Sequence, residues 1–127
     1  MDSDGSLQRR ILSALKERPP NSTIQEWSAG PKRLRIELLA GGDIQVVFHE
    51  LGKRGTPFET MFVIPSGEEE PASEDIADFV EQILDERIVL LMDGRFLRGG
   101  RRWVSPERIS GFRKVDLVCS WAGTYDR

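Results

Sequence analysis

The sequence has one cysteine, Cys119, and one histidine, His49, among its 127 residues. A single cysteine excludes an internal disulfide framework and fits a reducing compartment. A single histidine excludes any site that needs two imidazoles. The sequence has no apolar run near the length of about 18 residues that spans a bilayer, and its acidic, polar start at residues 1–5 is unlike a secretory signal. We therefore expect a cytoplasmic protein that is not embedded in a membrane.

Motifs for cofactors and metals are also missing. The glycine pairs at 41–42 and 99–100 lack the lysine and the following helix of a phosphate-binding loop. A zinc site needs three or four ligands from cysteine, histidine and acidic residues. The acids Glu74, Asp78 and Glu81 lack the glycine-containing spacing of a calcium loop. We therefore expect no cofactor and no bound metal.

Cysteine-based catalysis is not expected either, because it needs a thiolate beside a base. Cys119 alternates with Val115, Leu117 and Trp121 on what we expect to be a buried strand face, so it is interpreted as a small core residue. His49 follows an inward-facing position and points to the other side of its strand. We expect no catalytic residue in this chain, which favours a non-enzymatic protein. The 21 acidic residues leave a small enzyme with a carboxylate and arginine site as a third alternative.

Charge is present but segregated along the chain. There are 18 basic and 21 acidic residues in total, for a net charge of −3. Residues 66–93 contain ten acidic residues and one basic residue, whereas residues 94–114 contain seven basic residues and one acidic residue. Either the two segments neutralise each other in the fold, or at least one of them faces a charged partner, since focused surface charge steers association.

The N-terminal third predicts a helix and then a loop. Ser6 is a plausible N-cap, and the pair Pro19 and Pro20 ends the helix because proline lacks a backbone donor. The apolar positions at helical spacing are Leu7, Ile11, Ala14 and Leu15. Residues 21–32 predict a loop with at most a short extended piece at 24–27.

A β-hairpin follows, because apolar and polar residues alternate over 34–38 and 44–48. A two-residue turn would put Leu38 and Gln45 on one face. A three-residue turn at 41–43 keeps the apolar set together, and it pairs Leu38 with Val46 and Ile36 with Phe48. We predict the three-residue turn.

A third strand and a second helix are predicted next. Residues 58–64 are apolar on both faces, as in a central or covered strand, and residues 68–72 predict an exposed linker. Ser73 is a good N-cap for the helix, with Glu74 and Asp75 in its first turn. The apolar stripe of this helix is Ile76, Phe79, Val80, Ile83 and Leu84.

The C-terminal third predicts short strands. The apolar run 88–92 predicts a strand, which a turn at Asp93 and Gly94 connects to a strand over 95–98. A turn at 99–100 then leads into a strand over 101–104. A short helical turn that starts at Ser105 and a last strand over 114–121 complete the segment. Residues 122–127 predict a loose tail. Together the elements predict one α+β domain over 1–127. Its mostly antiparallel sheet has five to seven strands, with two helices packed on one face in the order α-β-β-β-α-β-β-β.

The predicted function is protein binding. The acidic side of the second helix places its carboxylates at spacings of four, three and four, and we interpret it as a docking face for a charged protein; its residues are Glu74, Asp78, Glu81 and Asp85. The layout and the acidic pI of about 5.3 resemble small bacterial adaptor proteins such as secretion chaperones and immunity proteins. This resemblance is one of layout alone and implies a partner protein. The edge strands and the richly apolar third strand also predict oligomerisation, in the form of a homodimer.

The alternative is a nucleic-acid or anion-binding domain built on the basic segment 95–114. Arginines supply forked donors for phosphate, and an exposed aromatic ring can stack on a base. The residues for this alternative are Arg98, Arg101, Arg102 and Trp103. A pI of about 5.3 argues against general nucleic-acid binding, for which a basic domain is expected.

Overall fold

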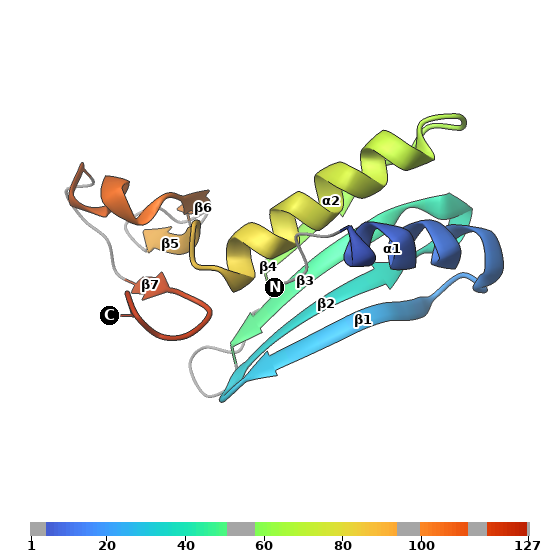
Figure 1. Ribbon diagram of the computed structural model, residues 1–127. Coiled ribbons are helices and arrows are strands. Elements are labelled where there is room, and N and C mark those ends of the chain that lie inside the picture. Colours follow the sequence, from blue (N-terminus) through green and yellow to red (C-terminus); the bar gives the residue numbers. More distant parts are fainter. Residues whose placement is uncertain (1–4, 51–57, 94–99, 112–116, 127) are drawn as a thin grey trace. The chain divides into compact units, whose positions relative to one another are not determined.

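The computed structural model describes residues 5–50, 58–93, 100–111 and 117–126 (Figure 1). Within these ranges the chain forms two α-helices and two antiparallel sheets, one of four strands and one of three. The predicted α+β class and antiparallel pairing are confirmed, although the strands divide between two sheets instead of one. The chain groups into two compact units, residues 1–80 and 81–127. The single domain over 1–127 stays a prediction.

The first helix, α1, spans Ser6–Glu17. Gly5, with a φ of 84°, occupies the capping position, and its carbonyl accepts a hydrogen bond of 3.0 Å from the N–H of Arg9. Ser6, predicted as the cap, is instead the first helical residue. The predicted apolar face is confirmed at Leu7, Ile11 and Ala14, which are buried, whereas Leu15 is half-buried.

A strand that the sequence did not predict follows α1. The four-stranded sheet has the order β1-β2-β3-β4, formed by β1 (Ser22–Ala29), β2 (Lys32–Leu38), β3 (Ile44–Glu50) and β4 (Phe58–Phe62). β1 replaces the predicted loop over 21–32. Its register with β2 shifts between Thr23 and Gln25. Its large apolar residues, Ile24 and Trp27, are three positions apart in the sequence. This bulge removes the period of two by which a strand is recognised.

The hairpin of β2 and β3 has the predicted faces but a longer connection. Leu38 pairs with Ile44, and Ile36 pairs with Val46. The predicted pairing of Leu38 with Val46 is therefore wrong by two residues. The connection runs over 39–43, and the N–H of Leu39 donates to the carbonyl of Asp43 at 2.8 Å. Parity distinguishes odd from even loops only, so a five-residue connection keeps the same apolar face as a three-residue one.

β4 lies at an edge of its sheet, which corrects the prediction of a central or covered strand. It pairs with β3 over its whole length, from Phe48 with Phe58 to Ile44 with Phe62. No described strand pairs with its other edge. Met61 on β4 and Val63 just after it are exposed.

The second helix, α2, spans Glu69–Leu84 and begins four residues before the predicted cap. Ser73 is buried inside the helix, and its Oγ donates to the carbonyl of Glu69 at 2.6 Å. The predicted linker over 68–72 is therefore mostly helical. Pro71 is tolerated because the N–H groups of a first helical turn have no acceptor within the helix. 

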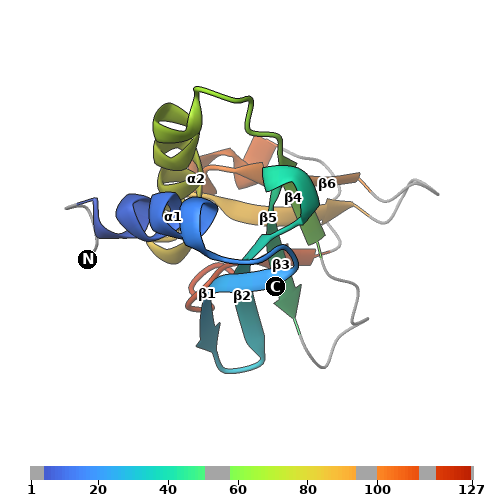
Figure 2. The same ribbon diagram turned by 90° about the vertical axis from the view of Figure 1, so that its right-hand side faces the viewer.

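One face of the four-stranded sheet is covered by α1 and the first part of α2, as Figures 1 and 2 show. This confirms the prediction of two helices on one face. Phe62 of β4 packs against Phe79 of α2, with ring centroids 5.7 Å apart. The buried residues of this layer on the sheet and helices include Ile11, Leu34, Ile36, Ile44, Val46, Ile76 and Val80.

The three-stranded sheet has the order β6-β5-β7, formed by β5 (Val89–Asp93), β6 (Gly100–Val104) and β7 (Leu117–Cys119). Asp93 pairs with Gly100, so both are strand residues and the predicted turns at 93–94 and 99–100 are wrong. β6 and β7 lie on the two sides of β5. Residues 95–98 themselves, like 114–116, lie outside the described residues.

A small core holds this second sheet together. Its residues are Val89, Leu91, Val104 and Val118, with Ile109 packed against them. Ile109 belongs to a short 3₁₀ helix, Pro106–Gly111, and Arg108 donates its N–H to the carbonyl of Ser105 at 3.0 Å. The predicted helical turn that starts at Ser105 is confirmed.

Candidate functional site

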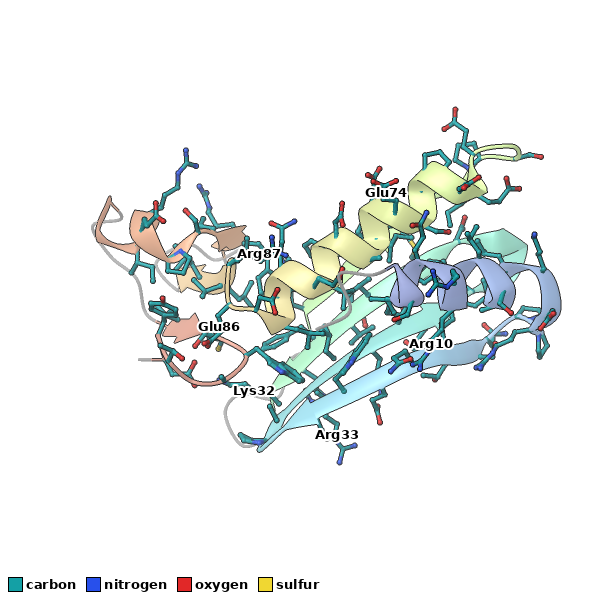
Figure 3. All side chains as sticks on the ribbon, viewed as in Figure 1. Arg10, Lys32, Arg33, Glu74, Glu86 and Arg87 are labelled. Atoms are coloured by element: carbon teal, nitrogen blue, oxygen red, sulfur yellow. The ribbon has the colours of Figure 1, made fainter. Side chains whose placement is uncertain are left out.

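The predicted docking residues lie mostly on one side of α2. Glu74, Asp78 and Glu81 share a side of the helix by their spacing of four and three residues; we call these three the acidic face. Asp85 follows the last helical residue. The opposite side of the helix holds the buried residues, so the acidic face points away from the core. Figure 3 shows Glu74 on the side of α2 away from the sheet.

The carboxylates on this helix differ in how far they are already engaged. Glu74 and Asp78 are exposed and form no ion pair with any side chain that the structure describes. Glu81 is half-buried. Asp85 lies 3.5 Å from the guanidinium of Arg87. The acidic face therefore has its most available charge at Glu74 and Asp78.

Unpaired carboxylates one helical turn apart favour a cationic partner. Like charges at this spacing repel each other and destabilise a helix slightly. A lysine or arginine from another molecule would relieve that repulsion and add an attractive interaction. The arrangement suits recognition of positive charge.

The basic segment is not assembled as one patch among the described residues. Arg98 lies outside them, and of Arg101 only the backbone is described, opposite Met92 in the register. Arg102 pairs with Leu91, and Trp103 pairs with Leu90. Adjacent strand residues point to opposite faces, so Arg102 and Trp103 do not share a face. Arg102 is exposed, whereas Trp103 is half-buried.

A polar cluster that the sequence did not predict surrounds Glu86. This residue follows α2 with a left-handed φ of 57°. Its carboxylate accepts hydrogen bonds from the N–H of Ala122 (3.0 Å), the N–H of Thr124 (3.3 Å) and the hydroxyl of Thr124 (2.6 Å). Glu86 is labelled in Figure 3. Its partners are 36 and 38 residues away in the sequence, and no local pattern announces such a contact.

The environment of Glu86 changes its acidity. Burial alone would raise the pKa of this carboxyl, but hydrogen bonds from Thr124, Ser120 and Ala122 favour the charged form and lower the pKa below its ordinary value of 4.5. A second carboxylate, that of Asp126, accepts the N–H of Ser120 at 2.7 Å. Several residues of the segment 122–126, which belongs to the predicted loose tail, thus form hydrogen bonds with Glu86 or Ser120. Whether the tail is loose in solution stays a prediction. We interpret the cluster as structural.

An arginine and a glutamate meet on the other face of the four-stranded sheet. The register aligns Glu26, Arg35, Val47 and Glu59 in one row across the strands. The Nη1 of Arg35 lies 3.9 Å from the Oε2 of Glu26, and these side chains are 35% and 44% exposed. Solvent screens such a pair. Val47 in the same row is 2% exposed and the Nε of Arg35 is buried, so part of this row is shielded from solvent.

The remaining candidates for chemistry are simple to place. Cys119 is 1% exposed, which confirms it as a core residue, and His49 lies in the other sheet. Among the residues that the structure describes, no group of three or more histidines, cysteines or acids could hold a metal ion. Neither described helix combines the length and the apolar character that a bilayer crossing needs.

Comparison with known proteins found no protein-family model, no curated protein and no solved structure that matches this chain.

Proposed function

We propose that this chain is a non-enzymatic, cytoplasmic protein-binding domain that docks a basic protein surface on the acidic face of α2. The observation that carries the proposal is the exposure of Glu74 and Asp78, which have no ion pair with any described side chain. Cys119 is the one cysteine of the sequence and is buried, which supports a reducing location.

The helix that carries these carboxylates is well anchored. Ser73, Ile76 and Val80 are each 0% exposed on its inner side. At its N-terminal end the side chain of Gln8, from α1, donates to the carbonyl of Glu70 at 3.1 Å. A rigid helix loses little conformational freedom when a partner binds, so more of the interaction energy appears as affinity.

A basic protein surface is the partner that this charge pattern fits. Complementary charge accelerates encounter and selects among partners more than it adds affinity. The acidic segment 66–93 strengthens the negative field around the face. Association is therefore expected to slow as ionic strength rises, because salt screens exposed charges.

The test compares two variants of equal net charge. E74S/D78S removes the two available carboxylates, and E17S/E107S removes two exposed acids elsewhere. Each tagged protein is used for affinity capture from native lysate, with quantitative mass spectrometry of the bound proteins. At about 0.5–1 kcal/mol for each lost charge pair, E74S/D78S should retain its partner about 5- to 30-fold less than the parent.

The control E17S/E107S should capture the same proteins as the parent at the same level. Equal capture by the parent and by E74S/D78S, with circular dichroism showing an unchanged fold, would remove the acidic face from the proposal. A titration with labelled single- and double-stranded oligonucleotides at low salt runs in parallel. Binding there would favour the alternative based on Arg102 and the other residues of the basic segment.

A further inference from the structure

The edge of β4 away from β3, with which no described strand pairs, carries exposed apolar residues. Three large hydrophobic side chains are exposed among the described residues, and two of them, Met61 (51%) and Val63 (71%), lie on β4 or just after it. An edge strand also offers backbone donors and acceptors to another chain. This combination marks the edge as a pairing surface.

The opposite edge of the same sheet is protected in several ways. On β1 a bulge interrupts the register near Thr23, the guanidinium of Arg18 donates to the Thr23 carbonyl at 2.6 Å, and Arg10 bonds to the side chain of Gln25. Bulges and charged side chains at an edge discourage pairing with other chains. β4 has a continuous register with β3 and one charged residue, Glu59. The β1 edge is therefore protected against pairing with another chain, whereas the β4 edge lacks these features among the described residues.

We propose that β4 pairs antiparallel with β4 of a second copy of this chain, around a two-fold axis at Thr60. This register uses all five residues of β4 and places Phe58 opposite Phe62 of the other copy, twice. Aromatic pairs directly across neighbouring strands are among the more stabilising cross-strand pairs. On the other face Glu59 lies opposite Met61 of the other copy. The result is one continuous eight-stranded sheet.

The self-complementary order of these five residues is what selects a second copy as the occupant. An isologous contact needs a surface that matches itself under a two-fold rotation. Here the same side of the strand carries an aromatic residue at each end and threonine at the centre. Phe62 already packs against Phe79, so the inner face of the pair continues the core. The dimer does not depend on the acidic face or on its partner.

The first test is a charge swap read by sedimentation velocity across a concentration series. M61E places a glutamate directly opposite Glu59 of the other copy, twice, and should weaken the dimer about tenfold because like charges opposed across strands repel. E59K/M61E restores opposite charges at the same contact and should recover the dimer. S28E adds the same charge to the edge strand β1 and should leave dimerisation unchanged. 

The second test is a disulfide at the axis. In this register residue 60 is the position that meets its own copy, at a Cα separation of about 4.5–5.5 Å that a disulfide can span. T60C should form a covalent dimer on mild oxidation, whereas S28C should not; Cys119 is buried and gives little background. A parent that stays monomeric at every concentration, or a dimer insensitive to M61E and without a T60C cross-link, would overturn the proposal.

Discussion

At the scale of single residues, Glu86 has the most defined environment in the chain. Its carboxylate is held by three hydrogen bonds from the C-terminal residues Ala122 and Thr124. None of this could be read from the sequence, because the donors are two backbone N–H groups and a hydroxyl far along the chain. The single-residue interpretation of Cys119 was confirmed because alternation in an apolar run reports burial directly.

Replacing Glu86 tests this cluster through stability. E86Q keeps one acceptor oxygen but turns an NH₂ group toward the N–H donors, so we expect a loss of about 1–2 kcal/mol in the free energy of unfolding at neutral pH. The measurement is urea denaturation followed by circular dichroism.

The pH dependence of E86Q follows from the lowered pKa of Glu86. A carboxyl whose pKa is lower in the folded state than in the unfolded state stabilises the fold well above 4.5 and loses that contribution as the pH falls through its folded pKa. The gap between the parent and E86Q should therefore narrow in acid. T124V, which removes the hydroxyl donor alone, should show a smaller loss. A gap that is constant from neutral to acidic pH would contradict the charged interaction.

At the scale of elements, patterns with an intact period were predicted well and the others were not. The buried face of α1 and the shared apolar face of β2 and β3 follow from spacing alone. β1 was missed because its bulge breaks the alternation, and the connection between β2 and β3 was misjudged because parity does not give loop length. The start of α2 was placed too late because Ser73 has the chemistry of a cap, and the sequence does not show that Pro71 falls in a first turn.

Substitutions at Ser73 distinguish a cap from an interior position. Inside a helix, alanine is more stable than glycine by about 1 kcal/mol, whereas at an N-cap glycine is preferred to alanine. We therefore expect S73A to be the more stable of the pair S73A and S73G. I76A, at a position that is 0% exposed, should cost about 2–5 kcal/mol and serves as the reference for a core residue. Thermal and urea unfolding of the three variants would show the order, and the reverse order for alanine and glycine would place the cap at Ser73.

At the scale of the whole molecule, composition was a good guide to fold class and a weaker one to organisation. The strand-rich pattern with two amphipathic segments gave the α+β class, but nothing in it separates one sheet of seven strands from sheets of four and three. The segregation of charge was visible at once. The sequence does not show which carboxylates are available to a partner. The structure does, because it shows that Asp85 forms an ion pair with Arg87.

The two compact units are expected to unfold together. α2 runs without interruption from Glu69 to Leu84, and buried residues such as Val80 and Ile83 fall on either side of the division between the units. W103F/W121F leaves Trp27 as the fluorescence reporter of residues 1–80, and W27F leaves two reporters in residues 81–127. In each variant the fluorescence and far-ultraviolet circular dichroism midpoints in urea should coincide, as in a two-state transition. Separate midpoints would show that the units unfold independently.

The contacts of Glu86 have a practical consequence for anyone who prepares this protein. Tails of a few polar residues are often trimmed before crystallisation, and residues 122–127 look suitable for such trimming on composition alone. Removing them would strip the carboxylate of Ala122 and Thr124 and leave an ionised, partly desolvated group at the end of the longest helix. A shortened protein of this kind should be checked for solubility and yield before its behaviour is attributed to the intact molecule.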